Sequence, residues 1–566
     1  MNQLVTTDYV VFLLYFVGVS SYGYWIYNQK KSKSLDTKDF FLAEGSLTWW
    51  AIGASLIASN ISAEQFIGMS GSGFTVGVAI AVYEWLAAIA LIIVAVWFIP
   101  IYLKNRIFTM PQFLSQRYNE TVSLIMAVFW LFLYVFVNLT SILFLGALAL
   151  SNLVGADQFH TIIVCLSVFA IIITLGGMKV IGYTDVIQVL VLIVGGLVTT
   201  YLALTKVSEV LGIGSGAIDG FTAMMADADD HFHMIFEKPG PNTSQADVNK
   251  YISLPGIAMY LAGQWIVNLN YWGCNQYITQ RALGADLKTA RTGILFAAML
   301  KIFMPVIVMV PGIAAYVIYK NGGLQAEMTT NGKVMADNAY SAVLTFLPNG
   351  LKGLSVAALT AAIVASLAGK ANSISTIFTL DIYRKYVEKN ATEQKLVWVG
   401  RITILIAMLI SIGFAWGDAL GIGGEGGFTF IQKYTGYVSP GIFALFILGF
   451  FWKRTNGTAA IVGVLLGFAL AIFFNDFAPA WFGNETLLYT AFFNSNSGKM
   501  EIPFLICMGW SFVFTVLVMV AISLAGPKIN PRGLEIDASM FKLHPANVVL
   551  IVIILLLISM LYARFW

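Results

Sequence analysis

The chain has 566 residues, of which 58% are hydrophobic and 11% are charged. Soluble globular domains carry about 25% charged residues, so this composition excludes an ordinary soluble domain and predicts an integral membrane protein. The formal net charge of +3 indicates no basic surface of the kind that binds nucleic acid.

Apolar runs of about 20 residues predict fourteen transmembrane helices. The first run has no basic residues before it and is followed by lysines, so we expect a retained helix and not a cleaved signal peptide. Lys and Arg recur in alternate short loops, which the positive-inside rule places in the cytoplasm, with the N-terminus outside. The predicted spans are 8–27, 46–72, 77–103, 120–150, 159–177, 182–206, 254–280, 292–320, 352–384, 396–417, 426–452, 456–477, 503–525 and 547–566.

The loop 207–253, which this topology places outside, contains the acidic stretch DADDHFH at 227–233. Aspartate and histidine are metal-binding residue types, but a solvated acidic turn is the interpretation that we favour. The cysteines Cys165, Cys274 and Cys507 lie in apolar segments, where we expect them to pack as small hydrophobic side chains without a disulfide framework.

Two predicted spans have polar interiors. ASNISAEQF (58–66) interrupts the second span, and NLNYWGCNQ (268–276) interrupts the seventh. Because these spans lie five apart, they are the first helices of two five-helix halves with opposite starting directions, as in inverted-repeat transporters. The predicted organisation is an extra helix and loop (1–45), a first repeat (46–206), an outer loop (207–253), a second repeat (254–452) and three further helices (453–566).

A broken helix in a membrane frees backbone carbonyls on one side of the break and N–H groups on the other. Carbonyls of Ala58 and Ile61 would suit a hard cation, and the amides of Asn60 and Gln65 would suit a polar solute. The alternative is that small residues such as those of GMSGSG (68–73) only let helices pack closely.

Ionisable residues inside the spans indicate function, because a charge in the bilayer core costs about 2.5–3.5 kcal/mol on insertion scales. Four such residues stand out: Glu84, Asp185, Lys301 and Lys370. Glu84 and Lys301 lie on different helices, where they could neutralise each other and offer hydrogen bonds to a neutral polyol. A purely structural ion pair is the alternative interpretation.

Several motifs together resemble the sodium/solute symporter family, and within it the bacterial sodium/galactose (sodium/glucose) cotransporters. The resemblance covers nearly the whole chain. The motifs are ASLIASNISAEQFIGMSGSG (54–73), YEWLAA (83–88), FVNLTS (136–141), TDVIQV (184–189), NLNYWGCNQYITQR (268–281), FAAMLK (296–301), IFTLDIY (377–383) and IQKYTGYVSPGIFALFILGFFWK (431–453).

The resemblance implies an all-α, LeuT-like fold with a sugar site at the midplane of a 5+5 inverted-repeat core. The implied substrate-binding residues are Asn60, Gln65, Glu84, Asn268, Tyr271, Lys301 and Gln432. Tyr271 matches the aromatic residue that stacks on the sugar and closes the inner side. The implied outer gate is Met69, Tyr83 and Phe428.

The resemblance also implies a sodium site between the first broken helix and the eighth core helix, at Ala58, Ile61, Ala362, Ala365 and Ser366. Ala365 stands where the family has a hydroxyl, so one side-chain ligand is missing. The expected ligands are then three carbonyls and the hydroxyl of Ser366, with sodium coupling weakened but present.

Lys370 is a second departure, one helical turn after Ser366. We expect it either to pair with Asp185, which matches an acidic residue near the family's sodium exit path, or to snorkel to the cytoplasmic interface. Positions 368 and 369 are Ala and Gly, so hydroxyls for an additional sodium are absent and one sodium per sugar is expected.

These features predict a sodium-coupled hexose symporter, working by alternating access in a bacterial plasma membrane, with sugar, sodium and lipid as its only evident partners. Open alternatives are another polar solute such as inositol, sialic acid or proline, proton coupling, a sugar sensor or a passive channel. An enzyme is not expected, because no arrangement of nucleophile, base and oxyanion hole is recognisable.

Overall fold

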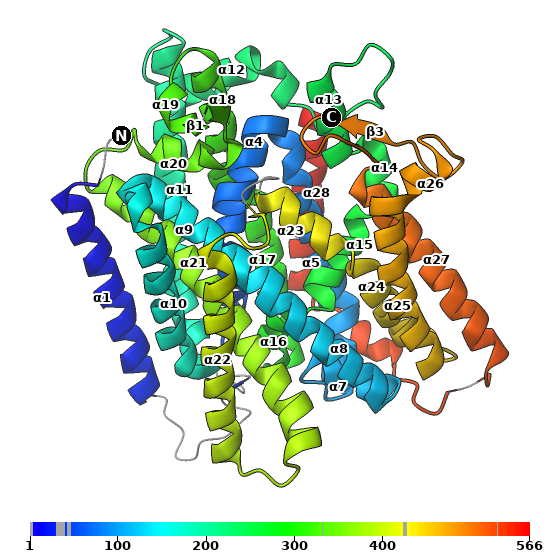
Figure 1. Ribbon diagram of the computed structural model, residues 1–566. Coiled ribbons are helices and arrows are strands. Elements are labelled where there is room, and N and C mark those ends of the chain that lie inside the picture. Colours follow the sequence, from blue (N-terminus) through cyan, green and yellow to red (C-terminus); the bar gives the residue numbers. More distant parts are fainter. Residues whose placement is uncertain (1–3, 30–39, 42–46, 331, 423–426, 529) are drawn as a thin grey trace.

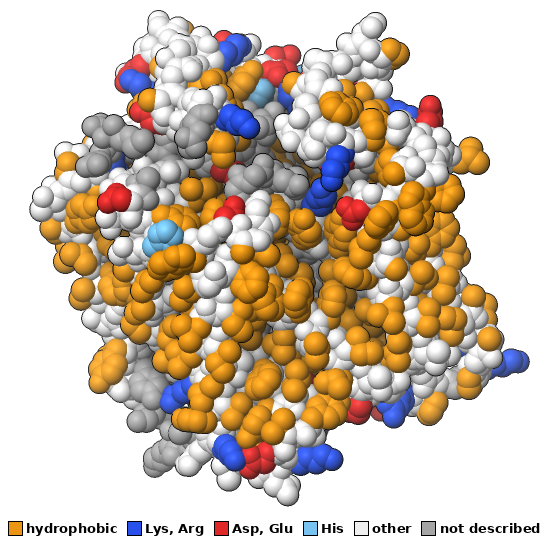
Figure 2. Space-filling view, viewed as in Figure 1, with side chains coloured by type: hydrophobic (Ala, Val, Ile, Leu, Met, Phe, Trp, Pro, Cys, Tyr) orange, Lys and Arg blue, Asp and Glu red, His pale blue; other side chains and the backbone are white. Residues whose placement is uncertain are grey.

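A computed structural model describes residues 4–29, 40–41, 47–330, 332–422, 427–528 and 530–566. The described chain is almost entirely helical, with two small antiparallel hairpins in loops between helices. The long helices run roughly side by side from one end of the molecule to the other (Figure 1). Hydrophobic side chains cover the middle of the face drawn in Figure 2, and charged side chains lie mainly toward its upper and lower ends. This distribution matches a bilayer flanked by water.

The N-terminal half contains the first broken segment, which α3 and η1 form. The elements of this half are α1 (Thr6–Gln29), α3 (Trp49–Asn60), η1 (Glu64–Met69), α4 (Ser70–Val76), η2 (Gly77–Ala81), α5 (Val82–Ile93), η3 (Val94–Phe98), α6 (Ile99–Lys104), α7 (Met110–Arg117), α8 (Glu120–Phe132), η4 (Leu133–Leu139), α9 (Thr140–Val154), η5 (Ala156–Gln158), α10 (Phe159–Leu175), α11 (Gly177–Val210), α12 (Ala217–Asp227) and η6 (Asp229–His231).

The C-terminal half contains the second broken segment and both hairpins. Its elements are α13 (Gln245–Ser253), α14 (Gly256–Leu261), α15 (Gln264–Gly273), α16 (Gln276–Leu283), α17 (Leu287–Val308), α18 (Val310–Lys320), α19 (Gln325–Met328), β1 (Thr329–Thr330), β2 (Lys333–Val334), η7 (Ala336–Asn338), α20 (Ala339–Leu344), α21 (Leu351–Thr376), η8 (Ile377–Val387), α22 (Glu393–Trp416), α23 (Gly427–Gly436), α24 (Ser439–Phe451), α25 (Gly457–Ile472), η10 (Phe473–Phe477), α26 (Ala478–Phe482), β3 (Phe492–Asn494), β4 (Lys499–Glu501), α27 (Phe504–Ala525), η11 (Ala538–Phe541) and α28 (Pro545–Phe565).

Within the described residues, ten helices are long and apolar enough to cross a membrane. The number rises to as many as twelve if each of two bent helix pairs is counted as one span. The predicted spans 254–280 and 426–452 are bent, by 79° between α14 and α15 and by 52° between α23 and α24. The segment 46–72 is divided, and α10 has only 17 residues. The predicted cytoplasmic loop within 1–45 lies largely outside the described residues.

Both predicted interruptions are present. α3 ends at Asn60, Ile61 has an extended backbone (φ −79°, ψ 105°), and the chain turns into the wider π-helical turn η1 at Glu64. α15 ends at Gly273 and α16 begins at Gln276. α3 packs against α11, α17 and α21, so the first break lies in the interior of the bundle, where protein covers its free backbone groups.

The acidic stretch of the outer loop is only partly a solvated turn. Asp229, Asp230 and His233 are exposed, but His231 is buried, with its Nε2 3.1 Å from the Phe74 carbonyl oxygen and its ring stacked on Tyr316. The loop thereby packs on α4. Among the described residues, no group of three or more His, Cys, Asp or Glu could hold a metal, and the three cysteines are free.

Candidate functional site

A cavity lies in the interior between the two broken segments and is partly open to solvent; the space within it and its opening, solvent included, is about 830 Å³. Its wall combines aromatic rings with amides and two pairs of opposite charges, which is typical of sites for small polar ligands. The lining residues are Asn60, Glu64, Gln65, Tyr83, Glu84, Ala87, Trp130, Leu133, Asn138, Val267, Asn268, Asn270, Tyr271, Trp272, Cys274, Asn275, Tyr277, Lys301, Lys370, Phe428, Ile431, Gln432, Thr435, Val438, Ser439 and Ile442.

The predicted pairing of Glu84 and Lys301 is confirmed. The Lys301 ammonium lies 2.5 Å from Glu84 Oε2 and also donates to Asn60 Oδ1. The two charged side chains come from α5 and α17 and are no more than 3% exposed. Because a buried ammonium needs both a counter-charge and hydrogen-bond acceptors, this arrangement fixes the position of the Asn60 amide beside the first break.

Tyr271 joins the two broken segments. Its hydroxyl accepts a hydrogen bond of 2.9 Å from Asn60 Nδ2. Its ring packs edge-on against the rings of Trp272 and Tyr277, at centroid distances of 5.2 and 5.6 Å. The ring therefore has a fixed orientation in the cavity wall, with its hydroxyl tied to the first repeat.

The amides of Gln65, Asn268 and Gln432 also line the cavity. Gln65 Oε1 accepts from the Ser62 N–H at 3.1 Å, and Asn268 Nδ2 donates to the Gln264 carbonyl at 2.9 Å. Each bond uses one polar atom and fixes the amide plane, and the other atom of each amide has hydrogen-bonding capacity. The structure thus brings all seven predicted substrate-binding residues to one cavity.

Two aromatic residues of the predicted outer gate, Tyr83 and Phe428, meet in the wall of this cavity. The rings of Tyr83 and Phe428 pack edge to face at a centroid distance of 5.1 Å. Tyr83, Phe428 and Gln432 also line a second cavity of about 340 Å³, so they form the wall between the two. Met69 is fully buried on η1 but lines neither cavity.

Of the predicted sodium ligands, Ser366 on α21 and the Ala58 carbonyl of α3 lie close together beside the first break. Ser366 Oγ donates to the Ser59 carbonyl at 2.8 Å and lies 3.4 Å from the Ala58 carbonyl. Ala362 and Ala365 are 1% exposed in the same helix, and Ile61 is fully buried. Backbone oxygens and a hydroxyl suit a hard cation. The Ser59 carbonyl is a candidate ligand that sequence reasoning missed.

The predicted pairing of Lys370 with Asp185 is wrong, and so is the interfacial alternative. The Lys370 ammonium lies 3.4 Å from Glu64 Oε1, and the Lys370 side chain is only 3% exposed. The reason is the direction of the side chains on α21. Lys370 faces the cavity, whereas the neighbouring Gly369, about 100° around the helix, faces Arg281.

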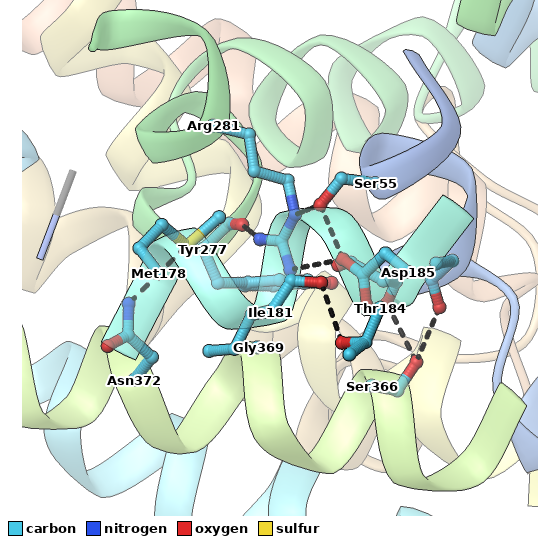
Figure 3. A network of polar contacts seen from close by, with 12 residues as sticks. Ser55, Met178, Ile181, Thr184, Asp185, Tyr277, Arg281, Ser366, Gly369 and Asn372 are labelled. Carbon is cyan, nitrogen blue, oxygen red and sulfur yellow. Dashed lines mark hydrogen bonds and ion pairs between the residues drawn. The ribbon is translucent and has the colours of Figure 1, made fainter. Parts of the chain in front are cut away.

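Asp185 belongs instead to a network with Ser55 and Arg281, which lies beside Gly369 of α21 (Figure 3). It lies 3.7 Å from Arg281 Nη2 and accepts a hydrogen bond from Ser55, while Arg281 Nε donates to Ser55 at 2.8 Å. A Cβ on Gly369 would lie 2.5 Å from Arg281 Nη2, so the glycine makes room for the guanidinium. Glu64 and Arg281 were the missed partners, although Glu64 lies within the predicted span 46–72 and Arg281 directly follows the predicted span 254–280.

Comparison with known proteins gives a consistent set of matches. The model of the sodium:solute symporter family matches residues 40–467. The sodium/glucose cotransporter of Vibrio parahaemolyticus is 42% identical, over 99% of this chain and 98% of that protein. The sodium/myo-inositol cotransporter 2 of Oryctolagus cuniculus is 33% identical over 83% of this chain and 70% of its own length. A solved outward-open structure of a Na⁺-coupled sialic acid symporter superimposes with a TM-score of 0.75 at 21% identity, covering 93% of this chain and 99% of that one.

Proposed function

This chain belongs to the sodium:solute symporter family, and we propose that it carries a hexose such as glucose or galactose into the cell together with sodium. The 42% identity to a sodium/glucose cotransporter along the full length of both chains is the observation that carries the substrate class. The chain is a transporter of the membrane and not an enzyme.

The charge balance of the cavity supports a neutral polyol. Lys301 with Glu84, and Lys370 with Glu64, line the wall as two pairs of opposite charge, so their formal charges cancel. An anionic substrate such as sialic acid would need an excess of positive charge. Hexose hydroxyls both donate and accept hydrogen bonds, which matches amide, carboxylate and ammonium partners.

The proposed contacts divide between polar and aromatic groups. Gln65, Asn268 and Gln432 hydrogen-bond the hydroxyls, with Asn60, Glu84 and Lys301 completing the polar set. Tyr271 covers the apolar face of the sugar ring and closes the inner side. One sodium binds to carbonyls of Ala58, Ile61 and Ala362 and to the Ser366 hydroxyl, where Ala365 supplies no ligand.

The proposed architecture has fourteen spans, with repeats at 46–206 and 254–452, the N-terminus outside the cytoplasm, and a bacterial plasma membrane as its location. Three of these spans are formed by divided or bent helices, which is how discontinuous helices of inverted-repeat transporters expose backbone groups at the midplane. Asp185 lies on the proposed inward exit path of sodium.

Alternating access follows from the two ends of the cavity. Tyr83 and Phe428 separate this cavity from the second cavity, which we place on the outer side. Tyr271 closes the inner side of the cavity, where its hydroxyl is hydrogen-bonded to Asn60. Sodium at the first break favours the arrangement that binds sugar. Movement of the broken segments then opens the inner side, and sugar and ion leave together.

Inositol is a second candidate, favoured by the 33% identity to a sodium/myo-inositol cotransporter. It is also a neutral polyol, so the same donors and acceptors would serve it. Configuration at individual hydroxyls separates it from the hexoses.

A competition panel in proteoliposomes tests the function. Radiolabelled glucose should accumulate against its gradient when sodium is supplied outside, and unlabelled galactose, inositol and sialic acid rank the specificity. Gln432→Ala should abolish uptake while the protein stays folded in the membrane. Uptake that ignores sodium but follows a pH gradient would overturn sodium coupling, and downhill equilibration alone would indicate a channel.

A further inference from the structure

Two contacts join α21 to the broken helix, one on each side of the break. Before the break, the Ser59 carbonyl accepts from Ser366 Oγ at 2.8 Å. After the break, Glu64 lies 3.4 Å from Lys370, one helical turn further along α21. Both members of the ion pair are buried, at 3% exposure for Lys370 and 8% for Glu64. The first contact coincides with the proposed sodium ligands, and the second lies in the wall of the cavity.

The ion pair brings a positive charge to this contact whatever ions are in solution. A buried carboxylate is strongly disfavoured without a cation beside it, and the Lys370 ammonium meets that need for Glu64. The ammonium also lies 5.0 Å from the centroid of the Tyr277 ring, which packs against the ring of Tyr271. A change in its position would therefore be transmitted to the aromatic wall of the cavity.

We propose that the Lys370–Glu64 pair is a built-in cationic latch, which holds the broken helix against α21 and takes over part of the organising role of the co-transported sodium. This inference rests on the proposed function, in which sodium bridges the same two elements. The missing hydroxyl at Ala365 points the same way, because a sodium with fewer ligands organises the break less. Because the ion pair already holds the broken helix against α21, sodium binding changes the arrangement of these two elements less. The latch therefore lowers the coupling between sodium binding and sugar binding.

The direct test measures the local stability of the helix break at 58–66 in the absence of sugar. Hydrogen–deuterium exchange of the full chain in micelles is compared in choline chloride and in sodium chloride. In the unsubstituted protein, sodium should slow the hydrogen–deuterium exchange of residues 58–66 by less than about twofold. In Lys370→Met, sodium should slow the exchange of the same residues by at least about fivefold. Equal sodium protection in the two proteins would overturn the latch.

Three further variants keep the test decisive. Glu64→Gln/Lys370→Met removes both charges and leaves neither one buried alone, so it replaces Lys370→Met if that variant does not fold, with the same expected result. Lys370→Arg keeps the charge and should behave as the unsubstituted protein. Lys385→Met is the matched control, because it removes a lysine–glutamate pair (3.2 Å to Glu120) from η8, the continuation of α21. Its sodium protection should equal that of the unsubstituted protein.

A second measurement separates this inference from the proposed function. The ratio of the hexose Kd without sodium to that with sodium should rise at least about fivefold in the neutral double variant. An unchanged ratio would overturn the claim that the latch lowers coupling. A protein whose break is protected without sodium, but which binds no hexose under either condition, would retain the latch and overturn the sugar function.

Discussion

Glu84 and Lys301 form a buried ion pair whose members cannot be removed singly without a large cost. Their side chains are 3% and 1% exposed, and the ammonium also holds Asn60. Such a pair contributes little net stability compared with apolar residues, but breaking it leaves an uncompensated buried charge. Two charges kept inside a bundle at this cost, at the wall of a cavity, agree with a role in binding.

Replacement of Glu84 by glutamine should weaken hexose binding by about 10- to 100-fold, because a hydrogen bond to a charged group contributes about 1.5–3 kcal/mol. Isothermal titration of the purified protein with glucose measures the change. Glu120→Gln is the control, because that carboxylate is exposed. Wild-type affinity in a folded Glu84→Gln protein would remove Glu84 from the proposed site.

Ala365→Ser should add the hydroxyl that the proposed sodium site lacks. One additional oxygen ligand to a cation, at about 1.5 kcal/mol, should lower the sodium concentration for half-maximal uptake roughly tenfold. Ala371→Ser is the control, since that buried position lies about 120° around α21. A sodium titration of uptake in proteoliposomes gives the comparison, and an unshifted curve would show that position 365 does not face the ion.

The helix α21 illustrates how one element is fixed by another. It begins after Gly350, whose φ of +87° only glycine adopts easily, and the N–H groups of Gly350 and Gly353 donate to Asp8 Oδ1 at 2.7 and 2.9 Å. Asp8 is fully buried on α1. A carboxylate at the N-terminus of a helix satisfies its free donors and interacts favourably with its dipole. The helix α1, which lies outside the predicted repeats, thus anchors α21, the helix that carries Ser366 and Lys370.

Asp8→Ala should lower the free energy of unfolding by about 1–2 kcal/mol, the usual cost of losing a capping side chain. Asp219→Ala is the matched control, because that aspartate is exposed in the first turn of α12. The unfolding midpoints of the purified proteins in detergent provide the measurement. Equal midpoints for the two variants would mean that α1 does not stabilise α21 through this contact.

Arginine side chains also bind backbone carbonyls near the C-terminal ends of two helices. Arg117 is fully buried and donates to the carbonyls of Gly449, Trp452 and Thr455 at 2.8–3.0 Å. Arg454 similarly donates to the Ser523 carbonyl. These guanidinium groups donate to carbonyls at or just beyond the C-terminal ends of α24 and α27.

For the whole transporter, the proposed stoichiometry of one sodium per sugar sets a limit on the accumulation of sugar. Movement of one charge through about 100 mV supplies about 2.3 kcal/mol, and a tenfold sodium gradient adds about 1.4 kcal/mol. The sum of about 3.7 kcal/mol supports a sugar gradient of several hundredfold. Proteoliposomes with imposed potential and sodium gradient should reach this plateau. A plateau on the order of 10⁵-fold would instead require two ions.

Much of the site could be predicted from sequence because its signals are local. Both helix breaks were predicted from polar residues inside apolar runs. The pairing of Glu84 with Lys301, which the structure confirms, was predicted because the two charges lie inside different spans. Helix bends were harder to predict, because the apolar composition of 254–280 and 426–452 is the same whether the helix is straight or bent by 79° or 52°. Met69 lies at the break as expected but not in the cavity wall.

The sequence by itself determined the membrane class and the two interrupted helices, since these depend on composition and on position along the chain, and its resemblance to a known family supplied seven of the residues that line the cavity. Only the tertiary structure decided which buried charges meet. Lys370 pairs with Glu64, and Asp185 with Arg281, because adjacent positions on α21 point about 100° apart and face different helices. Ion-pair partners depend on which helix faces touch, and that is settled by the packing of the whole bundle.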